Sequence, residues 1–123
     1  MKTVMLVDDS PTMLMSIKAI LTKAGMAVET AKDGQDALDR IKAGLKPDLI
    51  ITDVNMPRMD GIAFVQEARK NGLRFIPILM LTTESEKSKR DAGKAAGATG
   101  WLVKPVQPDA LLGVVRQVLP GAV

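Results

Sequence analysis

The chain has 123 residues and a formal net charge of +3, and it contains neither cysteine nor histidine. This length suits one domain with its own core, and the missing residue types exclude disulfides, zinc–thiolate sites and a phosphohistidine on the chain itself. The basic residues are dispersed and aromatic residues are rare, so we expect no nucleic-acid partner. The apolar runs are far shorter than the about 20 residues of a membrane-spanning helix, so we expect no membrane partner. We expect a monomeric cytoplasmic protein.

Turn and cap residues divide the chain into alternating strands and helices. Ser10 is an N-cap candidate with Pro11 in the first helical turn, and Gly25 stands where a glycine commonly ends a helix. In chain order, the expected elements are a buried strand Val4–Val7, a helix Pro11–Ala24, a more exposed strand Ala27–Ala31, a helix between the Asp33-Gly34 turn and Gly44, a strand Asp48–Thr52, a helix between Gly61 and Asn71, a strand Ile76–Leu81, a helix Ser85–Ala96, a short strand Gly100–Val103 and a helix Pro108–Leu119.

This alternation predicts an α/β fold. Five strands interleaved with five helices favour a (βα)5 doubly wound parallel sheet between two helical layers. Right-handed crossovers then favour the flavodoxin-like strand order 2-1-3-4-5, in which the topological switch point lies between the first and third strands. We expect any binding crevice at that point.

Charged residues stand at the carboxyl ends of the predicted strands. Asp8 and Asp9 follow the first strand, Asp53 follows the third and Lys104 follows the fifth. The carboxyl ends of parallel strands meet at one edge of the sheet, so these residues are expected to converge there. Three acids in one crevice repel each other unless a cation joins them, and Mg²⁺ prefers such oxygen ligands while keeping waters for a phosphate. The pattern indicates metal-assisted phosphoryl chemistry.

The same positions resemble a known family. The acid pair after strand one, the single acid after strand three, a threonine after strand four and a Lys-Pro pair after strand five are together typical of the receiver domain of bacterial two-component response regulators. The likeness covers essentially the whole chain, and it is carried by Asp8-Asp9, Asp53, Thr82 and Lys104-Pro105.

That resemblance implies a role for each residue of the site. Asp53 would be the phosphoacceptor, taking a phosphoryl group from a phosphohistidine of a kinase. Mg²⁺ would be bound directly by Asp9 and Asp53, by Asp8 through a water and by the backbone carbonyl of Asn55. Thr82 would hydrogen-bond the phosphoryl group, and Lys104 would pair with Asp53 before transfer and with the phosphoryl group afterwards. The chain would thus assist its own phosphorylation and dephosphorylation without being an enzyme.

The resemblance also implies a switch and a set of tuning residues. The Lys104-Pro105 bond is expected to be cis, and Trp101 would move inward as Thr82 is drawn toward the phosphate. Asn55, Thr83 and Glu84 match positions that tune dephosphorylation, and Thr83 stands where the family most often has a smaller residue, so we expect it to narrow access to the phosphoryl group.

Among receivers, the chain most resembles single-domain chemotaxis regulators of the CheY type. The stretches 7–10, 80–84 and 96–101 carry this likeness, and the sequence ends soon after the last predicted helix, so we expect one receiver domain over residues 1–123 without an output domain. The likeness implies a chemotaxis histidine kinase as phosphodonor. Its target would be the flagellar motor switch, bound through the face of the fourth helix, fifth strand and fifth helix.

Several alternatives stay open from the sequence. A single-domain phosphorelay or phosphate-sink receiver would carry the same motifs. A phosphatase of the haloacid dehalogenase type needs a second acid where Asn55 stands, and an FMN-binding flavodoxin needs a hydroxyl- and glycine-rich loop where Asp8 and Asp9 stand. Individual residues also have purely structural interpretations: either acid of the pair could cap a helix, Thr82 could be an ordinary strand-end hydroxyl and Trp101 could simply pack.

Overall fold

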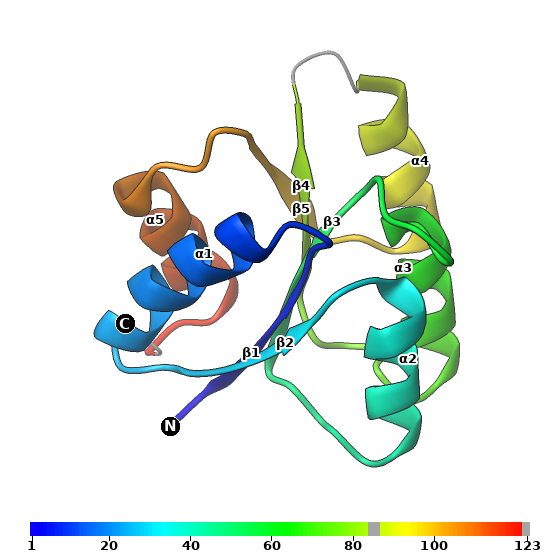
Figure 1. The fold of residues 1–123 in the computed structure, drawn as a ribbon, viewed down its shortest axis with the longest axis horizontal. Helices are drawn as coiled ribbons and strands as arrows, with labels where there is room; N and C mark the ends of the chain where they lie inside the picture. Colours follow the sequence, from blue (N-terminus) through cyan, green and yellow to red (C-terminus); the bar gives the residue numbers. More distant parts are fainter. Residues whose placement is uncertain (84–86, 122–123) are drawn as a thin grey trace.

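The computed structural model describes residues 1–83 and 87–121, which form a parallel sheet between two layers of helices (Figure 1). The strands of these residues are β1 (Thr3–Val7), β2 (Ala27–Ala31), β3 (Leu49–Asp53), β4 (Ile78–Thr82) and β5 (Gly100–Val103), and the helices are α1 (Pro11–Lys23), α2 (Gly34–Lys42), α3 (Gly61–Lys70), α4 (Lys87–Ala96) and α5 (Pro108–Val118). The strand order is β2-β1-β3-β4-β5 and all neighbours are parallel, which confirms the predicted fold and switch point.

The predicted bounds of β1, β3 and β4 differ from the structure by one or two residues. Strand β3 extends to Asp53, which therefore lies in the sheet opposite Leu81 of β4. Strand β4 begins at Ile78, two residues later than predicted. The carbonyl of Pro77 still accepts from the amide of Ile50 of β3 at 3.1 Å, but Pro77 has no amide hydrogen to donate and the carbonyl of Ile76 accepts a hydrogen bond from Arg69, so regular pairing begins only at Ile78. The first two residues of the helix predicted from Ser85 lie outside the described residues.

The core has one half on each face of the sheet. Helices α1 and α5 cover one face, and α2, α3 and α4 cover the other (Figure 1). Alternate residues of β1 serve both halves: Val4 and Leu6 pack toward α1 and α5, whereas Met5 and Val7 pack toward α2 and α3. A sheet buried on both faces explains the predominantly apolar sequences of β1, β3 and β4, whose polar residues stand at the strand ends.

Within residues 1–83 and 87–121, none of the helices combines the length and the apolar character that crossing a membrane requires.

Arg69 of α3 joins the α3–β4 connection to the α4–β5 connection through hydrogen bonds to backbone carbonyls. Its guanidinium donates hydrogen bonds to the carbonyls of Gly97 (2.7 and 3.1 Å), Leu73 (2.8 Å) and Ile76 (2.6 Å). Burial lowers the pKa of this group from its ordinary value. The side chain therefore provides hydrogen bonds to carbonyls of both the α3–β4 and the α4–β5 connections.

We expect Arg69→Met to lower the free energy of unfolding by about 2 kcal/mol, because it fills similar space but leaves buried carbonyls without donors. Urea denaturation followed by far-ultraviolet circular dichroism measures this loss. The matched control is Lys70→Met on the same helix, since Lys70 is 75% exposed and its ammonium lies 3.7 Å from the carboxylate of Glu67. That variant should stay within about 0.5 kcal/mol of the wild type, and equal losses in both variants would contradict the prediction.

Candidate functional site

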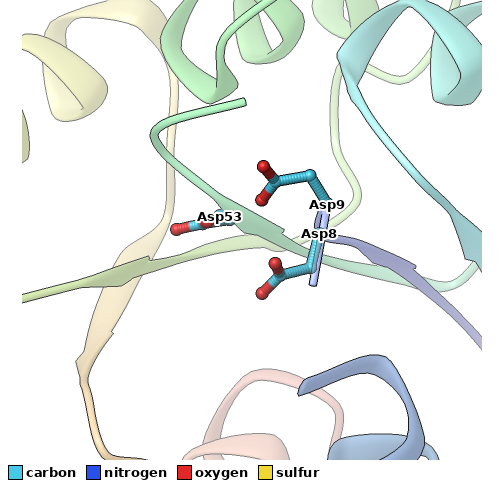
Figure 2. A group of neighbouring side chains, drawn as sticks. All are labelled: Asp8, Asp9 and Asp53. Carbon is cyan, nitrogen blue, oxygen red and sulfur yellow. The ribbon is translucent and has the colours of Figure 1, made fainter. Parts of the chain in front are cut away.

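Three carboxylates meet at the edge of the sheet where β1 and β3 end. Each of Asp8, Asp9 and Asp53 places one oxygen within 4.8 Å of the others. Figure 2 shows the three side chains close together, with every carboxylate directed to the same side. Asp8 and Asp53 are buried, and Asp9 is exposed. The predicted convergence is confirmed, and it follows from the pairing of β1 with β3.

Asp8 carries an unsatisfied oxygen in this cluster. Its Oδ1 accepts a hydrogen bond from the amide of Ser10 at 2.9 Å, whereas Oδ2 is buried and has no partner among the described residues. Burial raises the pKa of Asp8, and the negative charges of Asp53 and Asp9 raise it further, against the lowering effects of the Ser10 amide and Lys104. A buried carboxylate oxygen without a donor, facing two other acids, is a suitable ligand for a hard divalent cation.

Asp53 is joined to Lys104 across the crevice. The Nζ atom of Lys104 lies 2.7 Å from Oδ1 of Asp53, and the amide of Val54 donates to the same oxygen at 2.8 Å. The second oxygen, Oδ2, receives no hydrogen bond from the residues that the structure describes. One oxygen of the carboxylate is therefore held and oriented, while the other is available to a metal ion or an electrophile. The predicted contact of Lys104 with Asp53 is confirmed.

Thr82 supplies a hydroxyl at the end of β4. The residue is fully buried, and its Oγ1 has no hydrogen-bond partner within the described part of the chain. Its carbonyl accepts a hydrogen bond from the amide of Lys104 at 2.7 Å, so the ends of β4 and β5 are locked together. A buried hydroxyl left unpaired costs free energy, which is the behaviour expected of a group that bonds to an oxygen added later.

The β5 segment presents the remaining predicted residues. The Lys104-Pro105 peptide bond is cis, which agrees with what the resemblance to receiver domains implied. Trp101 is 43% exposed on β5, and the guanidinium carbon of Arg90 lies 5.5 Å from the centroid of its ring, which is a cation–π distance. Trp101 thus lies on the surface of the α4 side, away from the carboxylates, and its role as a switch stays a prediction.

Comparison with known proteins places this site in a family. The family model described as the response regulator receiver domain matches residues 4–116. The chain belongs to this family. Receiver domains take phosphoryl groups from histidine kinases and bind Mg²⁺ through acidic residues. The protein is accordingly a response regulator receiver domain of a two-component system.

Solved structures and curated relatives resemble this receiver domain over nearly its whole length. The chemotaxis protein CheY4 of Vibrio cholerae has a TM-score of 0.91 and 48% sequence identity, covering 97% of this chain and 99% of that one. The receiver domain of the sensor histidine kinase PA1611 from Pseudomonas aeruginosa, which has a magnesium ion coordinated in its active-site cleft, has a TM-score of 0.86 and 28% identity over 95% of this chain and 96% of that one. The response regulator MprA of Mycolicibacterium vanbaalenii is 40% identical over 94% of this chain and 49% of its own length. The receiver domain thus spans about half the length of the curated relatives it matches.

Of the predicted tuning residues, the structure describes Asn55 and Thr83 but not Glu84. Asn55 follows β3 on the exposed rim, and Thr83 is half-buried directly after β4. Glu84 lies outside the described residues, so its predicted tuning role has no structural account. The idea that an acid of the pair caps α1 is wrong, because the cap is Ser10, whose Oγ accepts from the amide of Met13 at 3.3 Å. The family assignment also favours a receiver over the phosphatase and the FMN carrier.

One ion pair beside the receiver site had no counterpart in the sequence prediction. Arg58, in the loop between β3 and α3, binds Asp33 at the start of α2. Asp33 could have been recognised as an N-cap from its position before Gly34, but nothing in the sequence links it to Arg58, which is 25 residues away.

Proposed function

We propose that Asp53 accepts a phosphoryl group from a histidine kinase of the chemotaxis type, in a reaction that requires Mg²⁺. The observation that supports this proposal is the arrangement of three carboxylates with ligand oxygens within 4.8 Å of one another, one of which is held by Lys104 at 2.7 Å. Asp9 and Asp53 would bind the ion directly, Asp8 through a water and Asn55 through its backbone carbonyl. When bound, the ion would offset negative charge on the transferring phosphoryl oxygens.

The residues of the chain then have separate tasks in the transfer. The Asp53 carboxylate attacks phosphorus, the P–N bond of the donor imidazole breaks with its electron pair returning to nitrogen, and an aspartyl phosphate forms. Lys104 moves its ammonium from the carboxylate to the phosphoryl oxygens, and Thr82 donates its unpaired hydroxyl to one of them. Asn55 and Thr83, at the rim, would regulate access of water during hydrolysis. The chain acts on its own aspartate and turns over no other substrate.

The experiment that tests this step uses a small phosphodonor. The protein is incubated with acetyl phosphate, with Mg²⁺ or with excess chelator, and its intact mass is measured. We expect a mass gain of one phosphoryl group only with Mg²⁺, removal of the label by hydroxylamine because an acyl phosphate is labile to it, and mapping of the label to the peptide that contains Asp53. Label on a serine or threonine, or no label with Mg²⁺ present, would contradict the proposal.

For the output we propose protein binding in chemotaxis, with the flagellar motor switch as target and the cytoplasm as location. The likeness to CheY4 supports this choice over a transcriptional role of the MprA kind, because the sequence identity is 48% to CheY4 and 40% to MprA over nearly the same share of this chain. The contacting face would comprise α4, β5 and α5, on which Trp101 lies. Calorimetric titration of a purified motor switch protein should show tighter binding with beryllofluoride and Mg²⁺ than without them. Equal affinity in both states would favour a relay or phosphate-sink receiver.

A further inference from the structure

The loop between β3 and α3, residues 54–60, is anchored at its carboxyl end. The side chain of Asp60 caps α3 by accepting from the amide of Ala63 at 2.8 Å, and the amide of Gly61 donates to the carbonyl of Val54 at 2.8 Å. A Cβ atom at Gly61 would collide with the carbonyl of Asp53, so only glycine lets the helix start this close to the phosphoacceptor strand. The first residue of the loop, Val54, is therefore hydrogen-bonded to the first residue of α3, Gly61.

The tip of this loop is fastened to another element by a fork of two hydrogen bonds. The Nε and Nη2 atoms of Arg58 lie 2.9 and 3.0 Å from Oδ2 and Oδ1 of Asp33. The Asp33 side chain is only 4% exposed, and its Oδ1 also caps α2 by accepting from the amide of Asp36 at 2.8 Å. The Arg58 guanidinium lowers the pKa of Asp33. A bidentate pair on an already fixed carboxylate restrains the loop in direction as well as in distance.

Backbone contacts reinforce the same attachment. The amide of Gly34 donates to the carbonyl of Met59 at 3.2 Å, and a Cβ atom at Gly34 would come within 2.6 Å of that oxygen. Among the residues described, Arg58 alone of the non-glycine residues has a positive φ, at 63°. An L-residue pays a conformational cost in this region, and such a backbone persists when its surroundings hold it. The backbone of Arg58 thus has a conformation that glycine adopts more easily, and the hydrogen bonds of its side chain to Asp33 help to hold it there.

The restraint can reach the metal site through a short and stiff path. Only Met56 and Pro57 separate Arg58 from Asn55, whose backbone carbonyl is a proposed metal ligand. Proline fixes its own φ, the amide of Met59 donates to the Pro57 carbonyl at 2.7 Å, and Met56 packs against the core half formed with α2 and α3. Little freedom remains between the fork and the carbonyl.

We propose that Arg58 and Asp33 are positioning residues for the divalent cation. Their ion pair holds the loop so that the Asn55 carbonyl stays where it completes the ligands supplied by Asp8, Asp9 and Asp53. This inference rests on the proposed metal binding of the site and adds two residues that do not touch the ion. Partners that orient ligands commonly change metal affinity by about 10- to 100-fold when they are removed.

The test is a double-mutant cycle on Mg²⁺ affinity measured by calorimetric titration with the metal alone. Arg58→Gly removes the fork and tolerates the positive φ, and Asp33→Asn keeps the α2 cap while removing the charge. Each variant is expected to weaken Mg²⁺ binding about tenfold, and the double variant no more than either single one. Arg40→Ala is the matched control: it breaks the α2 ion pair with Glu29 at 3.4 Å, leaves the loop untouched and should keep the wild-type affinity.

A second measurement reports on the loop without any metal. Hydrogen exchange of the Gly34 amide, which is bonded to Met59, should become faster in Arg58→Gly and Asp33→Asn than in the wild type. Faster exchange with unchanged Mg²⁺ affinity would overturn the proposal, because the loop would be freed without consequence for the ion. Additive losses of affinity in the double variant would overturn the pairing. A wild type that binds no Mg²⁺ at all would instead refute the proposed function, which keeps the two failures distinct.

Discussion

Asp53→Asn is expected to accept no phosphoryl group from acetyl phosphate in the presence of Mg²⁺. The amide has no anionic oxygen to attack phosphorus, so the acyl phosphate cannot form, and one of the three proposed carboxylate ligands is lost as well. Intact-mass measurement of the variant and the wild type, incubated side by side, checks this result. The effect is all or none, which makes it the largest change that we predict for the site.

The matched control for this variant is Asp60→Asn. Asp60 is exposed, stands in the same loop and caps α3, a task that asparagine performs about as well. It should be phosphorylated like the wild type. The single tryptophan gives a second readout: Mg²⁺ followed by beryllofluoride should change Trp101 fluorescence in the wild type and in Asp60→Asn but not in Asp53→Asn. A labelled Asp53→Asn protein would contradict the assignment of the phosphoacceptor.

Asp8→Asn is expected to raise the free energy of unfolding of the metal-free protein by about 1–2 kcal/mol at neutral pH. The wild-type carboxylate is 2% exposed, has an unpartnered oxygen and lies beside two other acids, so its charge opposes folding. Urea denaturation with chelator measures the gain. Added Mg²⁺ should stabilise the wild type by mass action and the variant less, so the difference in stability between them narrows or reverses as the ion is added.

The pH dependence of this gain has a definite sign. Because the pKa of Asp8 is raised in the folded protein, folding favours the protonated acid, and the wild type loses stability as pH rises from the ordinary value of 3.8 through the raised value. Asp8→Asn removes that loss, so its advantage should be small below about pH 3.8 and reach its full size above the raised pKa. Asp9→Asn, at the exposed acid, should weaken Mg²⁺ binding without a comparable gain. A gain independent of pH would contradict the electrostatic origin.

Sequence patterns predicted the fold and the core of the site because both depend on local signals that topology brings together. An apolar run such as Val4–Val7 of β1 is buried on both faces, which is typical of a parallel sheet with helices on each side. Once the strand order is known, acids at the ends of β1 and β3 have to converge, and Lys104 at the end of β5 can reach them. No information about individual side-chain contacts was needed.

The features that sequence reasoning missed depend on contacts between distant segments. Arg69 of α3 donates a hydrogen bond to the carbonyl of Ile76, which lies just before β4 in a different segment of the chain. The Arg58–Asp33 fork joins two loops that no periodicity relates, and it depends on a backbone conformation that arginine seldom adopts. Such pairs arise from the tertiary structure alone, so a pattern of residue types along the chain carries no trace of them.

The carboxylate cluster also sets the sequence in which reactants can arrive. With its three acids ionised and one ammonium beside them, the pocket carries a formal charge of −2, which repels an approaching anionic phosphodonor. A divalent cation bound by the proposed ligands would cancel that charge. Binding would then be ordered, cation first and donor second, and the concentration of free cation would set the fraction of molecules that can meet a donor productively. A cell that holds its magnesium constant would leave the rate of signalling to the kinase.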